Sequence, residues 1–275
     1  MEDLYPFKNY KEASEFFINT HQYNLASIIG NYDDVDLFTS DYALFWFDYL
    51  SGYDVILTHF GWNHTLVQDI ALVRGAANVQ NKKWGAIITW KYNHEPYLDS
   101  GEAIYVQILT AYEAGAKYAV IFNYAENMSG PYGTLQEEHF LALERFWNDV
   151  VNNQEVKHGS IKGEVALVLP NYYGWGMRNL EDTIWGLWEP DEKSHQIWEL
   201  QTSLLEEYGL ELDIVYADPD FPIENNYVKT INIPVENMNF SLTTLNILTI
   251  VILVILVIFL FYYTKFRKSR KRNQT

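Results

Sequence analysis

Three carboxylic acids stand at the points where apolar runs of the sequence end. Asp41 comes from "TSDY", Glu95 from "KYNHEP" and Glu126 from "NYAEN". Hydrolysis of a glycosidic bond requires two carboxyl groups about 5 to 10 Å apart that flank the bond. We predict Glu95 and Glu126 as this pair, because they follow successive apolar runs, and Asp41 as the third catalytic candidate.

Aromatic and amide side chains gather at the same run ends. Sugars offer apolar C–H faces that stack on indole and phenol rings, and hydroxyl groups that bind amides and carboxylates. These residue types therefore predict a carbohydrate-binding surface. The substrate-binding candidates are Trp62, Asn63, Trp90, Tyr92 and Asn123.

The histidines of the same segments give a rival hypothesis. If these segments are adjacent, His59, His64 and His94 could hold a metal ion for a metal-dependent hydrolase or deacetylase. The sequence contains no H-x-H or H-E-x-x-H pattern to support such a site. A third hypothesis is a surface protein that binds carbohydrate or acts as a scaffold without catalysis. The carbohydrate hypotheses need no cofactor, and we predict none.

Parallel strands are the elements that would position these residues. The runs "YDVILTHF" (53–60), "WGAIITW" (84–90) and "YAVIFNY" (118–124) begin 31 and 34 residues apart, the spacing of βα units. Their lack of alternation indicates strands covered on both faces. With a shorter strand in "VDLFTSD", residues 1–152 supply about four βα units. The sequence therefore predicts an α/β fold and half of a (β/α)₈ TIM barrel, because no phosphate-binding glycine motif supports a nucleotide-binding sheet.

A second, smaller unit follows over residues 153–222. Its strand "EVALVLP", its helix "HQIWELQTSLLEEYG" and its strand "LELDIVYADP" predict one βαβ crossover. Arg74, in "ALVRGAA" on a predicted helix of the first unit, is interpreted as an ion-pair partner. Residues 223–244, rich in Asn and Thr, are predicted to be a tether.

The C-terminal region predicts a single membrane crossing. Leu245–Tyr263 is 19 residues long and uncharged, which is long enough for a transmembrane helix. The tail, residues 264–275, carries six Lys and Arg and no acid, which predicts a cytoplasmic C-terminus and an extracellular body. Without those six residues, 13 Lys and Arg remain against 36 acids, a formal charge of −23 that argues against nucleic acid as a partner.

The start of the chain does not match an exported protein. "MEDLYPFKNYKEASEFF" lacks the basic and apolar regions of a signal peptide. A TIM barrel also needs about 250 residues, and only about 150 precede the second unit. We therefore expect an N-terminally truncated fragment, or a second chain that completes the barrel. The expected partners are carbohydrate and, through Leu245–Tyr263, the lipid bilayer of the cell membrane.

Three segments carry a resemblance to a known family. "TSDYALFWFDYLSGYDVILTHFGWNH", "IALVRGAANVQNKKWGAIITWKY" and "YEAGAKYAVIFNY" resemble the C-terminal half of a TIM-barrel protein of the glycoside hydrolase superfamily, of a kind found in uncharacterised archaeal surface proteins. "VALVLPNYYGWGMRN" with "DTIWGLW" is similar to the domain that follows such barrels, which is related to the glutamine-amidotransferase-like trimerisation domain of some β-galactosidases. The resemblance covers about residues 30–222.

This resemblance has consequences for catalysis. It implies that Glu95 follows the seventh barrel strand and is the nucleophile candidate. It also implies that the fourth strand, which would supply the acid/base, is absent from this chain. A chain of this kind is expected not to cleave a glycoside unaided.

Overall fold

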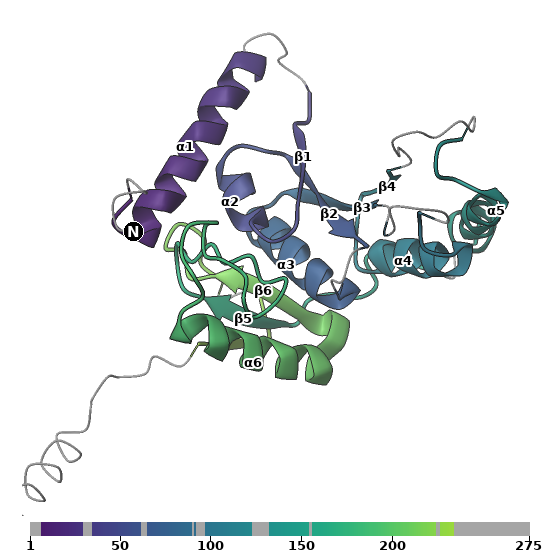
Figure 1. The fold of residues 1–275 in the computed structure, drawn as a ribbon. Coiled ribbons are helices and arrows are strands. Elements are labelled where there is room, and N and C mark those ends of the chain that lie inside the picture. The colour runs from purple at the N-terminus through teal and green to yellow at the C-terminus, as the bar shows by residue number, and fades with distance from the viewer. Residues whose placement is uncertain are drawn as a thin grey trace, which may run out of the picture. The chain divides into compact units, whose positions relative to one another are not determined.

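The computed structural model describes residues 7–29, 35–61, 65–89, 91, 97–122, 132–153, 156–223 and 226–233 (Figure 1). By its internal contacts the chain divides into two units, residues 1–233 and 234–275. All described residues belong to the first unit. None of the helices in these ranges has the length and apolar character that a membrane crossing requires. The predicted transmembrane segment, Leu245–Tyr263, and the basic tail lie outside the described residues.

Four parallel strands form the first sheet, called sheet A, in the order β1-β2-β3-β4. Each strand is joined to the next by a segment that contains a helix, as parallel pairing requires. The predicted α/β class is confirmed, and so is the predicted alternation of strands and helices. The elements are β1 (Phe38–Asp41), α2 (Phe45–Leu50), β2 (Val55–Phe60), α3 (Leu66–Val79), β3 (Lys83–Ile88), α4 (Gly101–Glu113) and β4 (Tyr118–Ile121).

Helix α3 is buried on two sides because it packs against both sheets (Figure 1). One side contacts β2 and β3, and the other contacts β6 of the second sheet. A Cβ atom at Gly75 would lie 2.6 Å from the backbone oxygen of Ile214, so only glycine allows this close approach. The neighbouring Arg74 is buried and forms an ion pair with Asp213 at 2.7 Å, which confirms the interpretation from sequence.

Three parallel strands form the second sheet, sheet B, in the order β6-β5-β7. The predicted βαβ crossover is present as β5 (Val165–Leu169), α6 (Glu192–Tyr208), a 3₁₀ turn (Gly209–Glu211) and β6 (Leu212–Tyr216). The third strand, β7 (Lys229–Asn232), pairs with β5. The prediction of a tether over 223–244 is therefore wrong for residues 226–233. The four residues "KTIN" form no apolar run, and they become a strand only through their pairing with β5.

The helix ends show which local signals hold. Gly115 (φ +97°) lies just after the end of α4, and Gly209 (φ +53°) directly follows the last residue of α6. Thr134 does not cap the next helix. Its hydroxyl is buried without a partner among the described residues, and His139 Nδ1 instead accepts the backbone N–H of Gln136. The remaining helices are α1 (Tyr10–Ile29), α5 (Glu137–Phe146) and a π-helical turn (Trp147–Val151).

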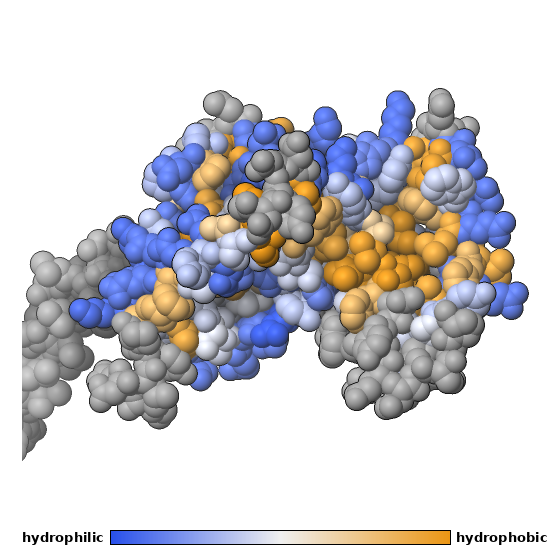
Figure 2. Space-filling view, turned by 90° about the horizontal axis from the view of Figure 1, so that it is seen from above, coloured by the Kyte–Doolittle hydropathy of each residue, from blue (hydrophilic) through white to orange (hydrophobic). Residues whose placement is uncertain are grey.

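The face of sheet A that points away from α3 carries exposed apolar side chains. Phe38, Val120 and Phe122 are 46%, 40% and 40% exposed, and Figure 2 shows an apolar patch in the part of the molecule where Figure 1 places β2 to β4. The rings of Phe38 and Tyr118, from the two outer strands, lie 5.0 Å apart. In a flat sheet these strands would be roughly 14 Å apart. The sheet therefore curls toward this face, and within the described residues it stays open at β1 and β4.

Candidate functional site

The carboxyl-terminal edge of sheet A is the candidate site. All four strands are parallel, so their last residues reach the same edge. In open parallel sheets and in barrels, ligands bind at this edge. Two of the predicted site residues lie there within the described chain. Asp41 is the last residue of β1, and His59 is the second-to-last residue of β2.

Asp41 is paired with a second carboxyl group, that of Asp48 on α2. Burial raises the pKa of Asp48 well above its usual range, and the charge of Asp41 and a hydrogen bond with Asp41 raise it further. Among the described residues no donor reaches Asp48 Oδ2. Burial and the neighbouring carboxyl group therefore both favour the protonated form of Asp48.

Asp41 is the more accessible member of this pair. Its Oδ1 accepts the backbone N–H of Tyr42. Asp48 is 3% exposed, whereas Asp41 is only partly buried. The arrangement places the carboxyl group of Asp41 at the edge of the sheet, with the buried Asp48 behind it.

Two stacked rings lie beside this carboxylate. The ring of Tyr42 stacks on the imidazole of His59, with centroids 4.4 Å apart and planes at 30°. The guanidinium carbon of Arg178 lies 6.0 Å from the centroid of the Tyr42 ring, within cation–π range. Asp41, Tyr42, His59 and Arg178 are called the edge cluster below. The cluster brings a carboxyl group, two aromatic rings and a guanidinium to this edge of the sheet.

Arg178 comes from the long loop between β5 and α6 of sheet B. Asp182 binds its guanidinium through two hydrogen bonds of 2.7 Å, which raise the pKa of Arg178 above its usual value. Gln68 of α3 donates to the backbone oxygen of Met177 at 2.6 Å, and this bond fixes the loop to α3. Met177 itself has φ +56°. This rare backbone conformation is held in place by the packed loop around it.

The tryptophans of this loop are part of the packing. Trp175 is fully buried and donates its indole N–H to the backbone oxygen of Asp182. Trp185 packs on Phe47 with ring centroids 4.7 Å apart. These side chains support the loop. Arg178 is the residue of the loop that belongs to the edge cluster.

A small polar cavity of about 80 Å³ adjoins the same edge at the end of β2. Lys91 and Asp99 form an ion pair of 3.2 Å across it, and Gln107 donates to Asp99. Its volume suits one or two water molecules and excludes a sugar ring. Ser100 caps α4, since its hydroxyl accepts the N–H of Ala103.

Most of the predicted site residues are not described. His64, His94, Glu95 and Glu126, and the substrate-binding candidates Trp62, Asn63, Trp90, Tyr92 and Asn123, all lie outside the described residues. The structure brings Asp41 and His59 together through Tyr42, and it leaves the predicted Glu95–Glu126 pair untested. Within the described ranges, no group of three His, Asp or Glu side chains is placed to hold a metal ion.

Sequence reasoning missed two residues of the site and its support. Asp48 was the one acid in the aromatic run "FWFDYL", which was a usable signal for a buried carboxyl group. Tyr42 carried no such signal, because its role depends on contacts with distant segments. Comparisons of the chain with family models, with curated proteins and with solved structures found no match.

Proposed function

We propose that the chain is a membrane-anchored, glycoside-hydrolase-like protein whose extracellular body binds carbohydrate at the edge cluster. One observation supports this most directly: the carboxyl group of Asp41 ends β1 next to Tyr42, whose ring stacks on that of His59. A carboxylate accepts hydrogen bonds from sugar hydroxyls, and an aromatic ring binds the C–H face of a sugar. The two groups together match the two kinds of surface that a sugar presents.

The curl of sheet A supports a half-barrel as the finer description of the fold. A barrel closes a sheet by curling it about an axis, and its inner face is lined by apolar side chains such as Phe38, Val120 and Phe122. In this proposal a second chain supplies the strands that pair with β1 and β4. Light scattering of the purified full chain tests this point, since a monomer would contradict completion by a second copy.

Binding is the primary activity in this proposal. Asp41 and Asp48 share a hydrogen bond, whereas the two carboxyl groups of a glycosidase stand about 5 to 10 Å apart with the glycosidic bond between them. Asp48 is also too buried to touch a sugar. Hydrolysis would therefore need Glu95 or Glu126 to act opposite Asp41.

A glycan array probed with the purified full chain in non-ionic detergent tests the proposal. We expect a defined set of glycans to be retained. Asp41→Asn should weaken their binding at least about tenfold, the size of one or two lost hydrogen bonds to a charged group. Asp36→Asn, which lies beside the opposite end of β1, is the matched control and should leave the affinity within twofold.

Two results of this experiment would overturn the proposal. One is an array that retains no glycan. The other is an equal loss of affinity in the two variants, which would indicate a general effect of charge. Turnover assays on the retained glycans, repeated with Glu95→Gln and Glu126→Gln, then separate a hydrolase from a binding protein.

A further inference from the structure

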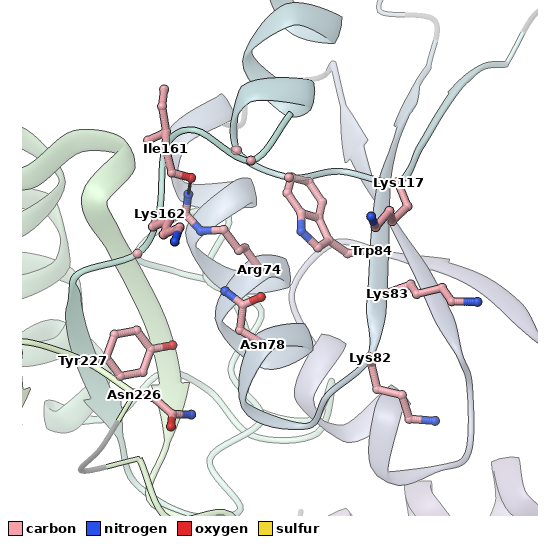
Figure 3. A pocket seen from close by; sticks show the side chains of 14 residues that line it. Arg74, Asn78, Lys82, Lys83, Trp84, Lys117, Ile161, Lys162, Asn226 and Tyr227 are labelled. Carbon is pink, nitrogen blue, oxygen red and sulfur yellow. Dashed lines mark hydrogen bonds between the residues drawn. The ribbon is translucent and has the colours of Figure 1, made fainter. Parts of the chain in front are cut away.

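A cavity of about 580 Å³ lies at the edge of the sheets opposite to the edge cluster (Figure 3). Its wall is made by residues that come just before or begin strands of both sheets. Lys82 precedes β3, Lys117 precedes β4, Lys162 lies shortly before β5 and Tyr227 shortly before β7. Arg74 of α3 lies between the two sheets. The cavity therefore belongs to neither sheet alone and is formed when the two pack on α3.

The charge of this cavity is opposite to that of the protein around it. Residues 1–264 carry 36 acids and 13 Lys and Arg. Five of those 13 basic residues line the cavity, and no Asp or Glu is found among the described residues of its lining. They are Arg74, Lys82, Lys83, Lys117 and Lys162.

Two of these cations are available to a ligand. Arg74, Lys82 and Lys83 are paired with Asp213, Asp54 and Asp36 at 2.7, 3.2 and 2.6 Å. Lys117 and Lys162 are exposed, and within the part of the chain that the structure describes their ammonium groups have no ion-pair or hydrogen-bond partner. Figure 3 shows Lys162 beside Arg74 and Lys117 beyond Trp84, while the ammonium groups of Lys82 and Lys83 point away from Arg74.

The rest of the lining suits a ligand larger than a bare ion. The volume falls within the roughly 300 to 1,000 Å³ that is usual for small-molecule sites. Trp84 is 3% exposed and presents an indole to the cavity. Asn78 and Asn226 add amide groups that can bind hydroxyls.

We propose that this cavity binds a sulfate or phosphate group, with Lys117 and Lys162 as the residues that contact its oxygens. Ammonium groups bind such oxyanions through charge-assisted hydrogen bonds. The oxyanion arrives either as the free ion or as an ester on a sugar, whose hydroxyls the amides of Asn78 and Asn226 can bind. This site lies on the opposite edge from Asp41 and does not depend on the function proposed above.

Isothermal titration of the full chain in non-ionic detergent tests the inference at constant ionic strength. The probes are inorganic sulfate, inorganic phosphate, glucose 6-sulfate and glucose 6-phosphate, with glucose as the neutral comparison. The Lys117→Gln/Lys162→Gln variant should lose at least about tenfold in affinity for the oxyanions that bind. The Lys8→Gln/Lys193→Gln variant removes the same charge from exposed positions outside the cavity, and its affinity should stay within twofold.

The outcomes separate the two sources of the oxyanion. Equal binding of ions and esters supports a site for the ion itself, and tighter binding of the esters supports a sulfated or phosphorylated sugar. The inference is overturned if no oxyanion probe binds, if glucose binds as tightly as its esters, or if both double variants lose the same affinity. Circular dichroism confirms that each variant is folded before it is titrated.

Discussion

The buried ion pair between Arg74 and Asp213 gives the sharpest test of how the two sheets are held together. The two side chains are 2% and 0% exposed, and Arg74 Nε lies 2.7 Å from Asp213 Oδ1. The guanidinium also donates to the backbone oxygens of Ile161, Leu210 and Leu212, at 3.4, 2.6 and 3.1 Å. Removing one partner of a buried pair costs about 3 to 5 kcal/mol, because the other charge remains desolvated.

Arg74→Met should therefore lower the free energy of unfolding by about 3 to 5 kcal/mol at pH 8. Burial already raises the pKa of Asp213, and the loss of Arg74 removes the group that most opposes this rise. In the variant the folded state then binds a proton more tightly than the unfolded state, so its stability falls as the pH rises. The defect should shrink toward acidic pH by up to about 1.4 kcal/mol per pH unit.

Urea unfolding at pH 5 and pH 8, followed by tryptophan fluorescence, measures both quantities. Arg74→Met/Asp213→Leu should recover most of the lost stability, because no charge is left buried. Lys11→Met breaks an exposed pair with Glu15 and should change stability by less than about 0.5 kcal/mol. A loss below about 1 kcal/mol for Arg74→Met at pH 8, or a double variant no more stable than the single one, would refute the reasoning.

Two further substitutions probe the site and the packing. Asp48→Asn should raise the free energy of unfolding at pH 8, because the amide can donate to Asp41 at every pH. In the native chain the raised pKa of Asp48 lowers stability as the pH rises. The loss is about 1.4 kcal/mol per pH unit from about pH 4 until Asp48 ionises. Thermal unfolding from pH 5 to 8 should show this slope in the native chain and a smaller one in the variant; identical slopes would contradict the protonated Asp48. Gly75→Ala should lower the free energy of unfolding by about 1 to 3 kcal/mol, because its Cβ would lie 2.6 Å from the backbone oxygen of Ile214. This loss is expected although alanine is roughly 1 kcal/mol more favourable than glycine in a helix. A more stable alanine variant in urea unfolding would show that α3 does not approach β6 this closely.

The strands of sheet A could be predicted from sequence because runs of consecutive apolar residues indicate buried strands. The run "YDVILTHF" gave β2 to within two residues, and the spacing of the runs gave the parallel βα order. What covers α3 could not be predicted. The small residues of "ALVRGAA" indicate close packing, yet nothing local indicates that β6, about 139 residues later, is the partner. The strand β7 was missed for the same reason, since its pairing with β5 is its only strand signal.

The sequence predicted where the candidate site lies, but it did not predict all of the residues that form it. The rule that ligands bind at the carboxyl ends of parallel strands placed Asp41 and His59 at one edge. It did not reveal the raised pKa of Asp48, which depends on how deeply α2 is buried. The place of Arg178 at this edge was also out of reach, because a loop of the second sheet brings it there and sequence spacing carries no such distance.

The position of Asp213 in the chain also sets an order on folding during synthesis. Arg74 precedes it by 139 residues, and ribosomes add about 5 to 20 residues per second. For about 7 to 28 seconds, α3 carries a guanidinium on a surface that later becomes fully buried. The helix can dock on both sides only after β6 has emerged. A nascent chain that stopped before residue 213 would keep this surface exposed. Quality-control proteases could then recognise the chain as incompletely folded.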